Sequence, residues 1–195
     1  KKSSKALYAD LTYELGELVT LRGGLRYTWD RGRLSDFKAQ AIRIDGVPVA
    51  NTIPGDPGNF DATTALRFSK GSVTGKVGVD LKLSPDHLLY ASYSRGYRGS
   101  SFNSQAFFAP DELTIAKPET VDAFEIGAKT QFLDRRLTLN GAVFLYNYKN
   151  QQALSLIGVL QPLVNIPKSQ IYGAELELVV RPLDDESDSD VALSQ

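Results

Sequence analysis

The side chains best suited to ligand binding surround one connection, residues 99–118. Phenylalanine rings within it can stack on a flat organic group, and arginine guanidinium groups just before it can hold an anion. The candidate contact residues are Arg95, Tyr97, Arg98, Phe102, Asn103, Phe107 and Phe108. An equally weighted interpretation is that the aromatic rings only pack the loop against its neighbours. The chemistry that this segment suggests is reversible binding of an anionic chelate.

The remaining chemical groups argue against catalysis and against a resident metal. The chain has no cysteine and a single histidine, His87, so thiol catalysis, cysteine-ligated metals and a Ser-His-Asp triad are not expected. Segment 45–61 carries oxygen ligands that can bind calcium, but their spacing matches no EF-hand, and a solvated turn is favoured. These oxygens belong to Asp45, Asp56, Asn59 and Asp61. We therefore expect no enzyme activity, no cofactor and no metal site.

The charges are nearly balanced, with 22 Lys+Arg against 23 Asp+Glu. A protein without a basic excess has nothing to neutralise a row of phosphates, so no nucleic-acid partner is expected. No run approaches the roughly 20 apolar residues of a membrane helix. The chain starts KKSSKALYAD and contains no methionine, so we expect a fragment or a processed product.

Apolar residues alternate with polar ones along most of the chain. A period of two places one apolar and one polar face on a β-strand, whereas a helix would show a period of 3.6. Several alternating runs reach 10 residues or more, near the roughly 9–11 with which a tilted strand crosses a membrane. About seven strands are predicted, at residues 7–15, 19–30, 73–83, 88–97, 124–132, 137–145 and 172–180.

Short and long connections follow one another strictly. The tight polar turns are Gly16-Glu17, Ser84–His87, Leu133–Arg136 and Pro182–Asp185. The long connections are 35–64, 99–118 and 151–167. In an antiparallel meander every second connection lies at the same end, so the strands have a short-turn end and a long-loop end. Transmembrane barrels have this asymmetry, with short periplasmic turns and longer extracellular loops.

Two other all-β arrangements remain possible from the pattern, with lower weight. A soluble sandwich also alternates, but it predicts shorter strands and loops of mixed length at both ends. A complete eight-stranded barrel needs one more strand, for which only a start near Asp190 is readable. In the membrane interpretation the charged face lines the lumen, where opposite charges pair across strands. Two aromatic girdles are also expected, from Tyr27, Trp29, Tyr93 and Tyr97 at the long-loop end and from Tyr90 and Phe132 at the other.

Several short motifs resemble the barrel of TonB-dependent outer-membrane receptors, in the order of that family. They are Arg95-Gly96-Tyr97 with Phe102-Asn103, Pro118-Glu119, Glu125-x-Gly127-x-Lys129, Asn150-x-Gln152 and Tyr172-Gly173-x-Glu175, with the strand at 19–30. The resemblance implies an all-β fold: an antiparallel up-and-down meander of about seven long amphipathic strands, part of a transmembrane β-barrel of about 22 strands. Residues 1–195 would then be a partial barrel domain without a plug domain.

The resemblance also implies a function and partners. Such receptors lie in the bacterial outer membrane and import a scarce nutrient, most often a ferric siderophore, with energy from TonB acting through the plug. We therefore expect this chain to contact outer-membrane lipid and a ferric siderophore or a similar small nutrient. The rival interpretation is a passive outer-membrane pore, or a structural or adhesive barrel, without active transport.

Overall fold

The computed structural model describes residues 1–35, 66–103, 114–155 and 162–181 in full. It also gives the backbone of four short strands, β3 (Phe37–Gln40), β4 (Arg43–Ile44), β5 (Val47–Pro48) and β6 (Asn59–Ala62). The predicted turn at 182–185 and the possible eighth strand near Asp190 lie outside these residues. The described part of the chain contains no helix that is long and apolar enough to cross a membrane.

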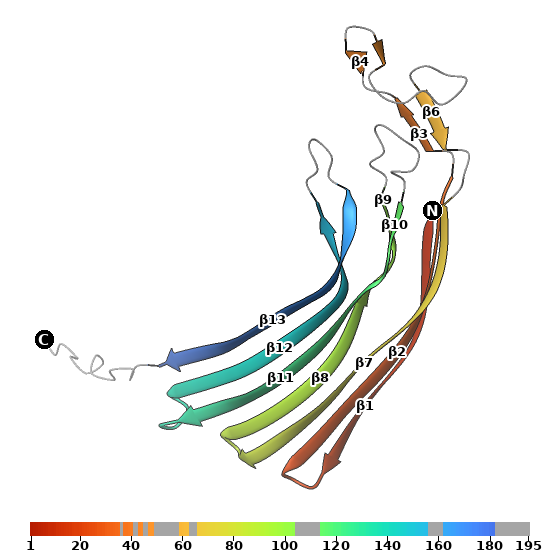
Figure 1. Cartoon of the computed structure of the whole chain (residues 1–195). Coiled ribbons are helices and arrows are strands. Elements are labelled where there is room, and N and C mark those ends of the chain that lie inside the picture. Colours follow the sequence, from red (N-terminus) through yellow and green to blue (C-terminus); the bar gives the residue numbers. More distant parts are fainter. Residues whose placement is uncertain are drawn as a thin grey trace, which may run out of the picture.

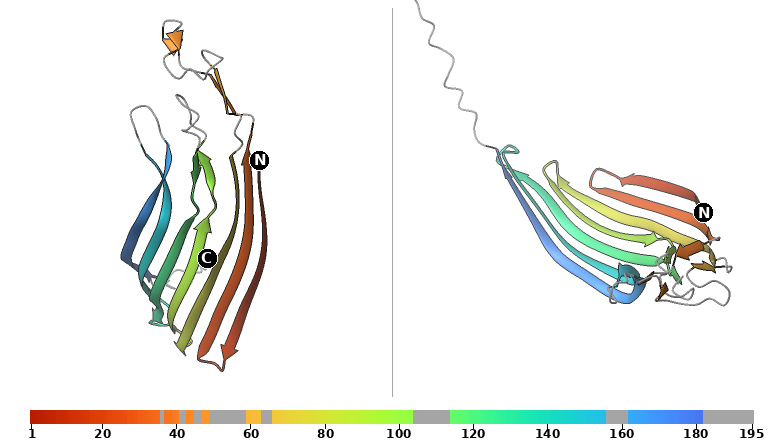
Figure 2. Two further views of the ribbon diagram at one scale, coloured as in Figure 1. Left: turned by 45° about the vertical axis from the view of Figure 1, so that its right-hand side comes forward. Right: turned by 90° about the horizontal axis from the view of Figure 1, so that it is seen from above.

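Seven long strands form one antiparallel sheet. They are β1 (Lys2–Leu15), β2 (Val19–Leu34), β7 (Leu66–Ser84), β8 (His87–Arg98), β11 (Glu119–Phe132), β12 (Leu137–Leu154) and β13 (Leu163–Val180). Their order in the sheet is their order in the chain, as Figure 1 shows. The predicted up-and-down meander is confirmed. Since β1 and β13 lie at opposite edges, the described strands form an open, strongly curved sheet and no closed small barrel (Figure 2).

At the short-turn end, several turn residues have a left-handed backbone conformation with positive φ. Gly16 has φ 66° in the turn between β1 and β2, where glycine carries no steric penalty. Three consecutive non-glycine residues, Leu133, Asp134 and Arg135, have φ 53°, 53° and 66° between β11 and β12. The side chain of Arg135 also ties this turn to the neighbouring one through an ion pair with Asp86 at 3.0 Å. The predicted turns at 16–17, 84–87 and 133–136 are therefore confirmed.

The predicted loop 151–167 is too long. In the structure β12 continues to Leu154 and β13 begins at Leu163. The sequence interpretation extended the loop to Pro167, because proline has no N–H to donate to a β-ladder. It lies opposite Asn150, which has φ 53°, and the pairing resumes beyond it at Gln151 and Ile166.

The sheet has one apolar face and no hydrophobic core of its own. Within the described residues the only buried apolar side chain is that of Ala116, whereas Leu11 is 69% exposed, Ile126 62% and Leu176 77%. The strand register gathers these exposed residues on one side of the sheet, which we call the apolar face. It comprises Leu7, Leu11, Leu25, Val77, Tyr93, Phe124, Ile126, Val143, Tyr172 and Leu176. So much exposed hydrocarbon requires an apolar environment such as a bilayer.

The opposite, polar face carries the cross-strand pairs that the sequence predicted. Asp80 on β7 forms an ion pair with Arg22 on β2. The Tyr90 hydroxyl donates to Glu125 on β11 at 2.7 Å, so Tyr90 does not belong to an aromatic girdle on the apolar face. On the same face the Asn140 amide donates to Glu177 on β13 at 2.7 Å. Such pairs suit a hydrated lumen better than lipid.

Gly24 leaves room for an ion pair that reaches across strand β2. Lys76 on β7 reaches Asp10 on β1 at 3.0 Å, and Gly24 of β2 lies between them in the register. A Cβ atom at Gly24 would lie 2.5 Å from the Asp10 carboxylate oxygen. A side chain at position 24 would therefore displace this ion pair, which passes directly over the Gly24 backbone.

Candidate functional site

The C-terminal end of β8 separates from β7 and turns over the polar face while it stays paired with β11. Its pairing with β7 ends at Gly75 and Arg95, although its pairing with β11 continues to Arg98 and Glu119. Beyond this point two short strands, β9 (Ser101–Asn103) and β10 (Thr114–Ala116), pair with each other as a small hairpin. Figure 1 shows this hairpin rising at the long-loop end of the sheet.

Contacts to β1 and β2 show where this segment lies. The Tyr97 hydroxyl donates to Asp30 of β2 at 2.5 Å, and the Lys2 ammonium of β1 donates to the Ser100 carbonyl at 3.3 Å. Asp30 and Lys2 both occupy polar-face positions in the register. Thr28, two residues before Asp30 on the same face, is only 2% exposed. The chain from Tyr97 to Asn103 therefore covers part of the polar face.

One lysine and two aromatic rings lie close together where the segment 97–103 covers the polar face. The Lys2 ammonium lies 6.0 Å from the centre of the Phe68 ring and 5.8 Å from that of Phe102. The two rings are 5.2 Å apart. We call Lys2, Asp30, Phe68, Tyr97, Arg98 and Phe102 the loop-base cluster. All except Phe102 line an open hollow of about 500 Å³. Lys2 and Arg98 can hold an anionic ligand in this hollow, and the rings beside Lys2 can stack on its flat parts.

Hydrogen bonds from β12 and β13 hold the two ends of segment 99–117 together. The side-chain amide of Gln152, which is 7% exposed, donates to the carbonyls of Gly99 at 2.9 Å and Lys117 at 3.0 Å. Asn165 accepts from the Lys117 N–H at 2.8 Å and donates to its carbonyl at 3.1 Å. The Glu119 carboxylate accepts from the Gln152 backbone at 2.8 Å. The two described ends of this segment therefore share one polar, hydrogen-bonded base.

The structure separates the predicted contact residues into groups. Tyr97, Arg98 and Phe102 come together in the loop-base cluster. Asn103 lies in β9 next to Phe102 and is 5% exposed. Arg95 lies apart from them on the apolar face, 3.7 Å from Asp122. Phe107 and Phe108 lie outside the described residues.

Tyr97 is a second aromatic residue, besides Tyr90, that does not lie in a predicted girdle. Tyr27, Trp29 and Tyr93 occupy the apolar face at the long-loop end, as the predicted girdle requires. Tyr97 does not, because β8 has separated from β7 by this point and the Tyr97 hydroxyl donates to Asp30 on the polar face. An alternation pattern cannot reveal a strand that turns across its neighbours.

Several residues of the site were missed in the sequence. Lys2, Asp30 and Phe68 carry no local signal, since they reach the site from strand ends far away in the chain. The anchoring residues Glu119 and Gln152 did have a signal, because both belong to the short motifs quoted above. Within the described ranges no group of three or more His, Asp or Glu residues is placed to hold a metal ion. The side chains of segment 45–61, including its acidic residues, lie outside the described set.

Comparisons with known proteins agree with this geometry. A family model described as TonB dependent receptor-like, beta-barrel matches residues 1–193. The pesticin receptor of Yersinia pestis is 25% identical over 172 residues, which cover 88% of this chain and 23% of that receptor. The chain thus spans about a quarter of the length of this relative.

Solved structures show the same fold. The ferric yersiniabactin uptake receptor FyuA from Yersinia pestis superposes with a TM-score of 0.67 at 21% identity, over 91% of this chain and 24% of that one. The copper transporter OprC gives a TM-score of 0.71 at 16% identity, over 94% and 27% of the two chains. These two proteins are named for different cargoes, ferric yersiniabactin and copper, so the fold does not specify one.

Proposed function

Since this chain belongs to the TonB-dependent receptor β-barrel family of the bacterial outer membrane, whose members are transporters and not enzymes, we propose that it forms part of the wall of a nutrient importer. The observation that carries the proposal is the open seven-stranded sheet with one apolar and one ion-paired face. The other strands and a plug domain would come from the rest of the receptor, because an open sheet edge in lipid leaves costly unpaired backbone groups.

The membrane orientation follows from the two ends of the sheet. The tight turns at 16–18, 85–86 and 133–136 would face the periplasm, and the long connections would lie at the cell surface. The polar face, with its ion pairs, would line the lumen. The loop-base cluster then stands where a nutrient arriving from outside first meets the barrel wall.

The cargo we propose is a ferric siderophore. Lys2 and Arg98 suit the negative charge of such a chelate, and the rings of Phe68 and Phe102 suit its flat apolar groups. The relatives named above include a receptor for ferric yersiniabactin uptake. Phe107 and Phe108 would add further contacts from the loop, and uptake would depend on TonB acting through the plug.

The test is uptake of a radiolabelled iron chelate by cells that carry the complete receptor, with and without a functional TonB system. Active import predicts that uptake is lost without TonB. The double variant Lys2→Gln/Phe102→Ala should weaken chelate binding, whereas Lys129→Gln, on the polar face near the short turns, should not. Unchanged uptake without TonB would favour the passive-pore alternative. The choice of cargo would be overturned if the receptor supports growth on cobalamin or a glycan but on no iron chelate.

A further inference from the structure

Across β8, β11, β12 and β13 the apolar face ends abruptly near the long-loop end of the sheet. One row across the strands consists of Tyr93, Phe124, Leu145 and Tyr172. The next row on the same side, two residues nearer the long loops, consists of Arg95, Asp122, Asn147 and Gln170. This change from aromatic to polar side chains is expected where a barrel wall leaves the hydrocarbon and enters the headgroup region.

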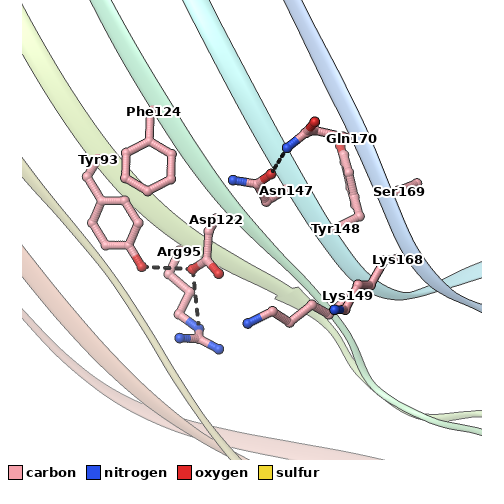
Figure 3. Close-up of a pocket in the computed structure, with 10 residues that line it drawn as sticks. All are labelled: Tyr93, Arg95, Asp122, Phe124, Asn147, Tyr148, Lys149, Lys168, Ser169 and Gln170. Atoms are coloured by element: carbon pink, nitrogen blue, oxygen red, sulfur yellow. Dashed lines mark hydrogen bonds and ion pairs between the residues drawn. The ribbon is translucent and has the colours of Figure 1, made fainter.

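A groove of about 840 Å³ lies at this boundary (Figure 3). Tyr93 and Phe124 form its apolar side, with ring centres 4.9 Å apart. Its charged side chains are those of Arg95, Asp122, Lys149 and Lys168. In the view of Figure 3, Lys149 extends toward Arg95 and Asp122. We call this feature the outer groove, because it lies on the face that meets lipid.

The outer groove has an excess of positive charge. Its single carboxylate, Asp122, is already engaged by the Tyr93 hydroxyl at 2.8 Å and by Arg95 at 3.7 Å. Lys149 and Lys168 lie directly opposite each other on β12 and β13, an arrangement that repels and destabilises a strand pair. Within the described residues neither lysine has an acidic partner. An anion bound between the two would relieve this repulsion.

We propose that the outer groove binds the phosphate group of a glycolipid in the outer leaflet. The two lysines and Arg95 would hold the phosphate, while Tyr93 and Phe124 would pack against the first carbons of the acyl chains. Basic pockets at a membrane surface recognise anionic headgroups in this way. A soluble anion fits less well, because one side of the groove is formed by the rings of Tyr93 and Phe124 and would face the bilayer. The inference rests on the membrane orientation proposed above.

The test uses the complete receptor, purified in a neutral detergent and titrated with lipid A, with native mass spectrometry as the readout. Each lysine near an anionic lipid contributes about fivefold to affinity, so Lys149→Gln/Lys168→Gln should bind lipid A about thirtyfold more weakly. The charge-keeping variant Lys149→Arg/Lys168→Arg should retain binding. The matched control Lys76→Gln/Lys129→Gln removes the same charge from the polar face and should bind like the wild type.

Three kinds of result would overturn the proposal. One is equal lipid A affinity in the Lys149/Lys168 double variant and in the polar-face control. Another is equal binding of lipid A and its dephosphorylated form, or full displacement of lipid A by inorganic phosphate. The third is equal affinity for phosphatidylglycerol, which would contradict the outer-leaflet assignment. Because binding is measured on purified receptor, the outcome is independent of whether the receptor imports iron.

Discussion

Ile126 offers the sharpest test of which face meets lipid. It lies near the middle of β11, between Ala91 of β8 and Val143 of β12, and its side chain is 62% exposed in the isolated sheet. The next position toward the N-terminus, Glu125, faces the other side and bonds Tyr90. An arginine at position 126 would therefore place a charge in hydrocarbon, whereas a change on the Glu125 side would not.

The expected cost of Ile126→Arg is about 2–4 kcal/mol, the range for arginine at the bilayer midplane on the lipid face of a barrel. This corresponds to a loss of roughly 30- to 900-fold in the folding equilibrium constant. The matched change on the polar face is Ser92→Arg, because Ser92 lies opposite Glu125 and the new charge gains a nearby carboxylate. Its effect should stay within about 0.5 kcal/mol.

The measurement is equilibrium unfolding of the complete receptor in phospholipid vesicles, with tryptophan fluorescence followed against guanidinium concentration. The variant Ile126→Gln removes the apolar side chain without adding charge, so its loss should lie between those of the two arginine variants. A larger loss for Ser92→Arg than for Ile126→Arg would refute the assignment of the faces. Equal losses would show that both faces meet the same solvent.

The other predictions concern the long-loop end. Gln152→Leu should lower the free energy of unfolding by about 1–3 kcal/mol, because the Gly99 carbonyl loses its buried donor. It should also speed chymotrypsin cleavage within 104–113. The control is Gln131→Leu, near the short turns. Tyr97→Phe should destabilise the receptor in urea by about 1.5–3 kcal/mol through loss of the hydrogen bond to Asp30, and no change would show that the bond is not formed. Single cysteines at the long-loop end should react with an impermeant maleimide on intact cells, whereas one in a short turn should not, and the reverse result would invert the topology. The sites are Asn59, Ser104 and Gly158 for labelling and Asp134 for protection.

Local sequence patterns were enough to predict the number of long strands, their two faces and their turns. Each of these properties depends on neighbouring residues, because side chains alternate with a period of two. The alternation of Leu137, Leu139, Gly141 and Val143 indicates a strand with one apolar face in any fold that contains it. The tight turns between strands likewise follow from short polar segments such as that at Leu133–Arg136.

The binding features depend on contacts that no local pattern contains. Lys2 and Ser100 are 98 positions apart in the chain, yet they are hydrogen-bonded because β8 leaves β7 and turns over the polar face. The same turn brings the Tyr97 hydroxyl to Asp30, although the alternation pattern places Tyr97 on the apolar face. The facing pair Lys149 and Lys168 arises only from the register of β12 and β13. Cross-strand register and strand departure are collective properties of the sheet, so the folded arrangement alone creates the loop-base cluster and the outer groove.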